Sequence, residues 1–487
     1  MRRELLFRAA YLVGCAALLW VLFAHWAYDD PFITYRYAQN IALGHGFVYN
    51  LGQRVLSTTT PLFALLLALG QVLNLDLPTL SNLIGVVSIA ASALILFELS
   101  RDWDTPAVGW AALLIYPTLP LVLTPLGLEM PFYIVLCLGA LLAHTRQRPM
   151  LAGTLAALAT LTRNDGVLIV VVLVTQIIWQ WRSQQAESRI NIKHGLRRFV
   201  PVYIIIVGAW FIFATLYFGA PLPVTLATKH AQAQLLGSSA FATAWPQLLR
   251  DYFSEGRYIA AGLLAGLGLI WSLIRKRAAW LLLGWMAAYA AAYSLLGVSN
   301  YFWYYAPLMA GAVVLMGLGW DAILRAVSHL IPSRAHTLLG FSGMLIIAIP
   351  FLARLPQVPT RFADRRLALY TAVGTWLRQN TPPTAAVAML EVGIIGYHAQ
   401  RPIIDFAGLI QPETVAHMRP GTTYQELATW VVDHYQPDYI VLHQGFAPAL
   451  EQGYIAQHCT LTQSFAAQDY DATLGVNIFA CRSAAAN

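Results

Sequence analysis

Several ionisable side chains that could perform acid, base or anion-binding chemistry stand close to the ends of long apolar segments. They are Asp29, Asp30, Glu129, Arg163, Asp165, Lys229 and His230. Charged groups at a membrane boundary are costly unless they face water, a partner or a ligand, so these residues are functional candidates. A carboxylate can deprotonate a hydroxyl as a general base, and a lysine or arginine can stabilise a departing phosphate. If the residues share one membrane face, they suit the attack of a hydroxyl on an activated sugar phosphate.

All of these candidates except His230 also have a purely structural explanation. Adjacent acids at the end of a span, such as Asp29 and Asp30, can act as a helix stop and interface anchor. Arg163 and Asp165 can form an internal ion pair that closes a broken span. Glu129 can be a charge that the dipole favours at a helix N-terminus, and Lys229 can be a solvated loop cation.

The composition places the chain among membrane proteins. Of its 487 residues, 58% are hydrophobic and only 11% are charged, whereas soluble domains are about a quarter charged. Several apolar runs approach the roughly 20 residues that cross a bilayer. The net charge of +7 comes from the apolar part of the chain, so it indicates loop orientation and not nucleic-acid binding.

The distribution of basic residues predicts the topology. Arg2, Arg3 and Arg8 precede the first apolar run and predict a cytoplasmic N-terminus with a retained first span, so the loop 28–61 should lie outside. The basic stretches 146–148, 182–198 and 275–277 should be cytoplasmic loops. The alternation between them predicts about 11 spans, and the aromatic run 301–305 is typical of a membrane interface.

Two segments depart from simple alternation. Residues 149–181 begin and end on the cytoplasmic side, so we expect them to cross twice, with 162–166 near the outer face. Residues 61–75 are too short to span comfortably and are predicted to form a juxtamembrane or re-entrant helix on the outer face. A short tilted span is the alternative.

The composition changes after residue 355, where LPQVPTRFADRR combines prolines with a charge cluster typical of a linker. We therefore divide the chain into a membrane domain, 1–355, and a soluble α/β domain, 356–487, on the outer face. Within the second domain, β-branched runs predict strands at 385–390 and 438–442, and helical spacing predicts helices at 367–379 and 423–435. An oxidising compartment would favour a disulfide between Cys459 and Cys481.

The first outer loop resembles the first-loop signature of GT-C glycosyltransferases, membrane enzymes that use polyprenyl-phosphate sugars. It reads DDPFITYRYAQNIALGHGFVYNLGQRV, followed by TTTP, and is most similar to that of actinobacterial arabinofuranosyltransferases and their mannosyltransferase-like relatives. Leu51 and Gln53 replace the usual Pro and Glu of that signature. PLGLEMPFY, LATLTRNDGVL and PLPVTLATKH are similar to three further family segments, with Met130 and Asn164 among the departures.

The resemblance implies a mainly α, polytopic helix bundle of the GT-C type in the bacterial plasma membrane, with an extracytoplasmic C-terminal α/β domain. It implies that Asp29 is the base or orients the acceptor, that Asp30 supports it or binds a metal, and that Glu129 is a second catalytic acid. Lys229, with Arg163, would hold the lipid phosphate. The predicted substrate-binding set is Arg36, Arg163, Asp165, Lys229 and His230.

The implied partners are a polyprenyl-phosphate sugar donor, a glycan, lipid or protein acceptor, and membrane lipids. The sequence has no His or Cys cluster with zinc spacing. Oxygen ligands at Asp30 and Glu129 would suit Mg²⁺, Mn²⁺ or Ca²⁺, so a divalent cation is left open.

Two other classes remain as alternatives. A transporter or flippase of lipid-linked sugars should carry charged pairs near the membrane midplane, often in inverted repeats, and the sequence contains neither. A non-catalytic GT-C relative is harder to exclude, although an intact Asp29 together with Lys229 argues against it.

Overall fold

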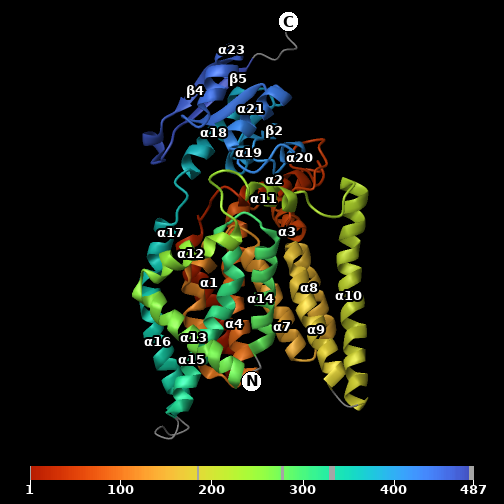
Figure 1. Ribbon diagram of the computed structural model, residues 1–487, viewed down its shortest axis with the longest axis vertical. Coiled ribbons are helices and arrows are strands. Elements are labelled where there is room, and N and C mark those ends of the chain that lie inside the picture. The colour runs from red at the N-terminus through yellow and green to blue at the C-terminus, as the bar shows by residue number, and fades with distance from the viewer. Residues whose placement is uncertain (1, 184–185, 276–278, 328–334, 482–487) are drawn as a thin grey trace.

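The computed structural model describes residues 2–183, 186–275, 279–327 and 335–481. A long helical bundle forms one part of the molecule, and a small α/β domain covers one end of it (Figure 1). We call this end of the bundle the domain end, and the N-terminus lies at the opposite end (Figure 1). Of the predicted basic loop 275–277, residues 276 and 277 lie outside the described residues.

Most passes of the bundle are single apolar helices. Seven helices in the described ranges are long and apolar enough to cross a membrane: α1 (Arg2–Phe23), α4 (Leu77–Asp102), α9 (Val167–Ser183), α10 (Ala186–Phe218), α13 (Gly256–Ile274), α15 (Ala306–Ala326) and α16 (Ala335–Arg354). Three shorter apolar helices continue the alternation: α7 (Met130–Thr145), α8 (Pro149–Thr162) and α14 (Trp280–Leu296). The polytopic α-helical fold predicted from the apolar runs is confirmed.

One pass is broken into short pieces. It consists of α5 (Pro106–Leu114), η1 (Tyr116–Thr118) and α6 (Pro120–Leu123). Pro117 and Pro120 interrupt it, because proline lacks the N–H that a continuous helix requires. The predicted loop 182–198 is wrong in most of its length, since α10 already begins at Ala186. The basic stretch there extends a helix and does not form a loop.

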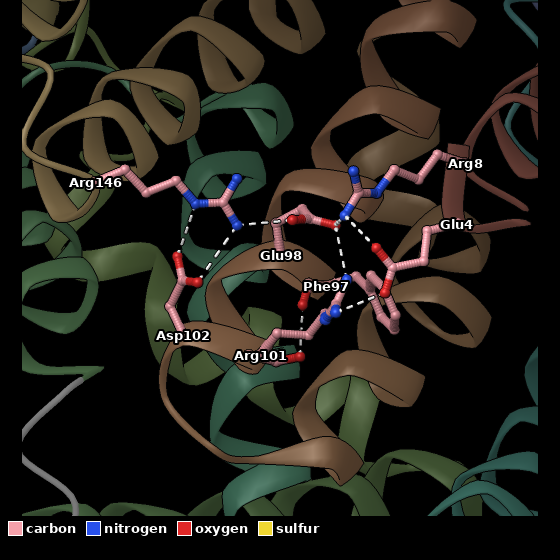
Figure 2. A network of polar contacts seen from close by, with 8 residues as sticks. Glu4, Arg8, Phe97, Glu98, Arg101, Asp102 and Arg146 are labelled. Carbon is pink, nitrogen blue, oxygen red and sulfur yellow. Dashed lines mark hydrogen bonds and ion pairs between the residues drawn. The ribbon is translucent and has the colours of Figure 1, made fainter. Parts of the chain in front are cut away.

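Ion pairs join α1, α4 and the residue that ends α7 (Figure 2). They lie at the N-terminal end of α1, opposite the α/β domain (Figure 1). The Glu98 carboxylate of α4 lies 2.8 Å from a guanidinium nitrogen of Arg8 and 2.7 Å from one of Arg146. Arg101 also donates to Glu4 at 2.9 Å. Because Glu98 is buried while the arginines are partly exposed, its charge is neutralised where three helices leave the apolar region.

Short helices occupy the domain end of the bundle. They are α2 (Pro31–Ala42), α3 (Pro61–Val72), η2 (Asn164–Gly166), α11 (Thr225–Gln232), α12 (Phe241–Phe253) and η4 (Phe302–Tyr305). The helix α3 packs against α2 near the α/β domain (Figure 1), which agrees with a juxtamembrane helix at 61–75. The break predicted at 162–166 is present between α8 and α9.

The C-terminal domain contains a mixed five-stranded sheet with the order β2-β1-β3-β5-β4. The strands are β1 (Val387–Met389), β2 (Ile403–Asp405), β3 (Tyr439–His443), β4 (Cys459–Phe465) and β5 (Val476–Cys481). β1 pairs in parallel with β2 and β3, whereas β5 is antiparallel to β3 and β4. The strands predicted at 385–390 and 438–442 are therefore present as β1 and β3.

Helices surround this sheet. They are α18 (Leu367–Asn380), α19 (Ile394–Ala399), α20 (Pro412–Val415), α21 (Tyr424–Tyr435), α22 (Pro448–Leu450), η7 (Glu451–Ile455), α23 (Ala456–His458) and η8 (Ala467–Tyr470). Two further short helices, η6 (Leu355–Gln357) and α17 (Val358–Arg361), lie beside the bundle instead, and their Leu355 and Val358 belong to its core. α18 and α21 confirm the two predicted helices, and a capping box of Thr423 and Glu426 starts α21. The predicted disulfide between Cys459 and Cys481 is also present, and it joins β4 to β5.

Candidate active site

A cavity of about 830 Å³ lies at the domain end of the bundle, within the size range of small-molecule sites. Its acidic, basic and histidine lining residues come from four separate stretches of the chain: Asp30, Glu129, Arg163, Asp165, Lys229 and His230. Apolar side chains of α9, α14 and the segment around α11 line part of the remaining wall, and the hydroxyl-bearing residues of 57–60 line another part. The structure thus brings six of the predicted site residues into one cavity and leaves out Asp29 and Arg36.

Asp30 occupies the N-cap position of α2, and Pro31 follows it at the start of the helix. The Asp30 side chain makes no capping hydrogen bond, and no hydrogen bond or ion pair within the described ranges occupies its carboxylate. Proline suits this first helical position because its missing N–H would have no partner there. Asp30 therefore presents a free carboxylate to the cavity.

Asp29 points to the α/β domain instead. Its Oδ1 accepts a hydrogen bond from the Ile394 N–H at 2.8 Å, and its Oδ2 accepts one from the Gly393 N–H at 3.1 Å. Burial raises the pKa of the Asp29 carboxyl well above its usual range, and the charge of Glu391 adds to this rise, whereas the bond from Ile394 opposes it. The sequence predicted a catalytic base at Asp29. In the structure, the backbone of the α/β domain binds this carboxylate, which does not line the cavity.

Arg36 also departs from its predicted substrate-binding role. Its guanidinium donates to three backbone carbonyls: to Tyr49 at 3.0 Å, to Arg401 at 2.5 Å and to Gly396. The side chain is buried and does not line the cavity. Because carbonyl oxygens occupy its donors, Arg36 connects the first loop to the α/β domain and is not free for an anion.

Arg163 links two carboxylates in the cavity wall. One terminal nitrogen donates to Glu129 Oε1 at 2.5 Å, and the other donates to Asp165 Oδ2 at 3.0 Å. Burial raises the pKa of the Glu129 carboxyl, although the Arg163 charge opposes this rise. The internal ion pair between Arg163 and Asp165, one of the two explanations offered by the sequence, is therefore present. Arg163 is also paired with Glu129, so two carboxylates oppose its charge.

Lys229 lies on α11 and is only 8% exposed. Its ammonium is 3.9 Å from the centroid of the Tyr301 ring, a cation–π contact. Its backbone carbonyl accepts a hydrogen bond from the Ser299 N–H at 3.0 Å. No carboxylate in the described part of the chain forms an ion pair with this ammonium, so Lys229 is a buried cation available to an anion.

His230 lies beside Lys229, and protein groups contact both of its ring nitrogens. Nδ1 is 2.9 Å from the Leu296 carbonyl oxygen, and Nε2 is 3.0 Å from the amide nitrogen of Gln234. The carbonyl requires a donor, so Nδ1 carries the proton and Nε2 accepts. His230 therefore ties α11 to α14 at the cavity wall.

The predicted metal ligands, Asp30 and Glu129, share the cavity, but Glu129 is already paired with Arg163. Among the described residues, no group of three or more His, Cys, Asp or Glu side chains could hold a metal ion. A pair in which one acid is neutralised by arginine is a poor fit to a divalent cation, so no catalytic step is derived through a metal.

Sequence reasoning missed several aromatic and apolar residues of the site. Tyr293 of α14 accepts a hydrogen bond from Arg163 at 2.8 Å and donates one to Asp165. Tyr304 lines the cavity, and Leu409 of the α/β domain joins the lining as well. The interfacial aromatic run 301–305 was a usable signal for Tyr301 and Tyr304, whereas nothing in the sequence distinguished Tyr293 or Leu409.

Comparison with known proteins identifies the fold. Residues 360–479 match a family described as a domain of unknown function (DUF8728), and no curated protein matches the chain. The oligosaccharyltransferase of Archaeoglobus fulgidus, tethered to an acceptor peptide containing the NVT sequon, superposes with a TM-score of 0.63 at 14% identity. The alignment covers 98% of this chain and 74% of the archaeal one.

A second similar structure is ArnT from Cupriavidus metallidurans bound to undecaprenyl phosphate, with a TM-score of 0.56 and 14% identity. That alignment covers 98% of this chain and 99% of ArnT. The apo form of ArnT gives a TM-score of 0.61 at 15% identity, with 98% of each chain covered. The chain therefore has the predicted GT-C-type fold, a polytopic α-helical membrane bundle with a C-terminal domain.

Proposed function

We propose that this protein is a glycosyltransferase that moves a sugar from a polyprenyl-phosphate donor to a hydroxyl acceptor. The observation that carries the proposal is the relationship between Asp30 and Lys229, which line the same cavity without forming an ion pair. A carboxylate without a hydrogen bond and a buried cation without an ion-pair partner then face a space large enough for a lipid-linked sugar. Such an arrangement suits a reaction that takes a proton from one group and releases an anion from another.

In the proposed reaction, Asp30 accepts the proton of the acceptor hydroxyl as that oxygen attacks the anomeric carbon of the donor sugar. A new bond forms between the acceptor oxygen and the anomeric carbon, and the bond from that carbon to the phosphate oxygen breaks. The polyprenyl phosphate leaves with the electron pair of the broken bond. Lys229 stabilises the negative charge that develops on the leaving phosphate.

The one cation among the described lining residues that lacks an ion-pair partner favours a donor with a single phosphate. Lys229 is the cation without a carboxylate partner, whereas Arg163 is paired with both Glu129 and Asp165. One positive charge matches the one negative charge of a phosphodiester-linked sugar better than the two charges of a diphosphate. We assign Glu129, Arg163 and Asp165 to one rigid wall that orients the sugar by hydrogen bonds.

The apolar lining supports a lipid tail on the donor. Leu222, Leu226, Leu295 and Leu296 line the cavity and are also exposed, so the apolar wall continues to the protein surface beside α11 and α14. A polyprenyl chain placed there would remain in the hydrocarbon while its phosphate reaches Lys229. ArnT bound to undecaprenyl phosphate and the archaeal enzyme bound to a dolichol-phosphate support this class of donor.

The first-loop resemblance supports a finer assignment to the arabinofuranosyltransferase- or mannosyltransferase-like group, with a pentose or hexose as the transferred sugar. The charge asymmetry supports a multi-pass protein of the cell membrane whose cavity and α/β domain are extracytoplasmic. A cell-envelope glycan, lipid or protein would then supply the acceptor hydroxyl.

The proposal is tested with purified full-length protein in proteoliposomes that contain radiolabelled polyprenyl-phosphate arabinofuranose or mannose, with cell-envelope extract as the acceptor. We expect transfer of label to the acceptor and loss of transfer in Asp30→Asn. Movement of the lipid-linked sugar between leaflets without transfer would instead support a flippase. Donor binding without either activity would identify a non-catalytic relative.

A further inference from the structure

We infer that Asp405, in the α/β domain, is a positioning residue that holds α11 so that Lys229 can meet the donor phosphate. The inference rests on the proposed role of Lys229. It assigns a task in the membrane cavity to a domain of otherwise unknown function. In Figure 1, α20 of that domain lies close to α11, and the two helices are in contact.

Asp405 ends β2 and is completely buried. Its Oδ1 accepts a hydrogen bond from the Ala407 N–H at 2.6 Å, and its Oδ2 accepts bonds from Leu409 at 2.5 Å and Ile410 at 3.1 Å. One carboxylate thus determines the path of the segment 405–410, which we call the Asp405 loop. A carboxylate with three backbone donors makes charge-assisted bonds that are stronger than neutral ones.

The Asp405 loop directs two carbonyl oxygens at α11. Ala407 O accepts from the side-chain amide of Gln232 at 2.9 Å, and Gly408 O accepts from the Thr228 hydroxyl at 3.3 Å. Gln232 and Thr228 are almost completely buried and are four residues apart, so they lie on one face of the helix. Gly408 has φ +71°, a conformation that glycine adopts readily.

The same glutamine continues the connection to the lysine. The Tyr301 hydroxyl donates to Gln232 Oε1 at 3.4 Å, and the face of the Tyr301 ring contacts the Lys229 ammonium. A chain of contacts therefore leads from Asp405 through the Ala407 carbonyl, Gln232 and Tyr301 to Lys229. Leu409, whose N–H is bound by Asp405, also lines the cavity.

Further backbone bonds attach the segment after α11 to the same domain. The Leu236 N–H donates to the Thr422 carbonyl at 3.0 Å, and the Gly421 N–H donates to the Gln234 carbonyl at 3.2 Å. These bonds anchor the end of α11, whereas the Asp405 loop contacts the turn that carries Lys229. Loss of Asp405 should therefore loosen this turn while the domain remains attached.

The experiment compares Asp405→Asn with wild type in two measurements on the full-length protein. The first is hydrogen exchange of the backbone amides of α11, and the second is the Kd for undecaprenyl phosphate, the donor lipid without its sugar. The asparagine places an N–H₂ group where one carboxylate oxygen accepted N–H bonds. We expect faster exchange in α11 and about tenfold weaker binding, the size of one lost charge-assisted contact.

Asp438→Asn is the matched control, because Asp438 also accepts a backbone bond in this domain, from Ala386 at 2.8 Å, but does not contact α11. Gln232→Met breaks the same connection from the other side and should weaken binding while the Asp405 loop stays intact. In a Lys229→Ala background, Asp405→Asn should weaken binding no further, because its effect passes through the lysine. A purely structural loss would still add to the lysine effect.

Unchanged α11 exchange and unchanged binding in both Asp405→Asn and Gln232→Met would overturn the inference. A wild-type protein that does not bind undecaprenyl phosphate would overturn the proposed donor site instead. Exchange in α11 would then decide, by itself, whether Asp405 holds the helix.

Discussion

Asp29 and Asp30 are adjacent in the chain, but their carboxylates belong to different parts of the molecule. Asp29 accepts hydrogen bonds from the backbone of Gly393 and Ile394 in the α/β domain, whereas Asp30 lines the membrane cavity. The backbone turns into α2 at this point, so consecutive side chains point in different directions. One acid of the pair therefore attaches the domain, and the other is free for chemistry.

This division predicts opposite behaviour of two conservative variants. Asp30→Asn should reduce sugar transfer by about 10²–10⁴-fold, the usual contribution of a positioned base, with no loss of thermal stability. Asp29→Asn should mainly lower the melting temperature, because the amide group replaces one of the two acceptor oxygens. Transfer rates and melting curves of both variants check this. Full activity in Asp30→Asn would show that Asp30 is not the base and would favour Asp29 in that role.

Lys229→Ala should weaken binding of the donor. A charge-assisted contact to phosphate contributes about 1.5–3 kcal/mol, which corresponds to about 10- to 150-fold in Kd. Lys229→Arg should recover part of this loss, since the charge remains but the compact ammonium does not. The measurement is transfer as a function of donor concentration, with Arg250→Ala, outside the cavity lining, as the control. An unchanged donor dependence would make Lys229 a structural cation.

Gly393→Ala should loosen the attachment of the α/β domain. A Cβ atom at this position would lie 2.0 Å from the Asp29 carbonyl oxygen, so the domain or the first loop must shift. Such overpacking costs about 1–3 kcal/mol. Gly453→Ala is the matched control, because a Cβ there meets nothing within 4 Å. Melting curves should separate the two variants, and equal stability would show that the interface is not tight.

Glu98→Gln should destabilise the opposite end of the bundle without changing the chemistry. The substitution leaves Arg8 and Arg146 without their shared, buried counter-charge (Figure 2). We expect a loss of about 1–3 kcal/mol, reduced by the partial exposure of the arginines. Asp104→Asn, in an exposed pair with Arg325 at 3.6 Å, should cost less than about 1 kcal/mol. Denaturation in detergent and the donor KM test both expectations.

Removal of divalent cations should leave transfer intact. Arg163 already neutralises Glu129 at 2.5 Å, and in the proposed reaction Lys229 supplies the cation for the phosphate. Transfer by purified protein in EDTA, compared with Mg²⁺ or Mn²⁺, provides the measurement. A loss of activity in EDTA that Mg²⁺ or Mn²⁺ restores would show that Asp30 binds a metal and is not the base.

Much of the architecture was predictable from the sequence by itself. Apolar runs and flanking arginines determine the membrane spans, because the cost of polar groups in hydrocarbon depends on local composition. The strands β1 and β3, the helices α18 and α21, and the break at Arg163 were readable for the same reason: each depends on neighbours within a few residues. The alternation of the spans also predicted that Asp30, Glu129 and Lys229 lie on the same membrane face.

Only the tertiary structure decided which of the candidate residues face the cavity. The partners of Asp29 and Arg36 in the α/β domain lie more than 350 residues away in the chain, and no local pattern reports such contacts. The same limit applies to Asp405, which acts on α11 through the Ala407 carbonyl and Gln232. The sequence by itself therefore determined the membrane class and the set of candidate residues. The packing of the α/β domain on the bundle decided which of these candidates line the cavity. A side chain that binds the backbone of the α/β domain, as Asp29 and Arg36 do, is no longer free to bind a substrate.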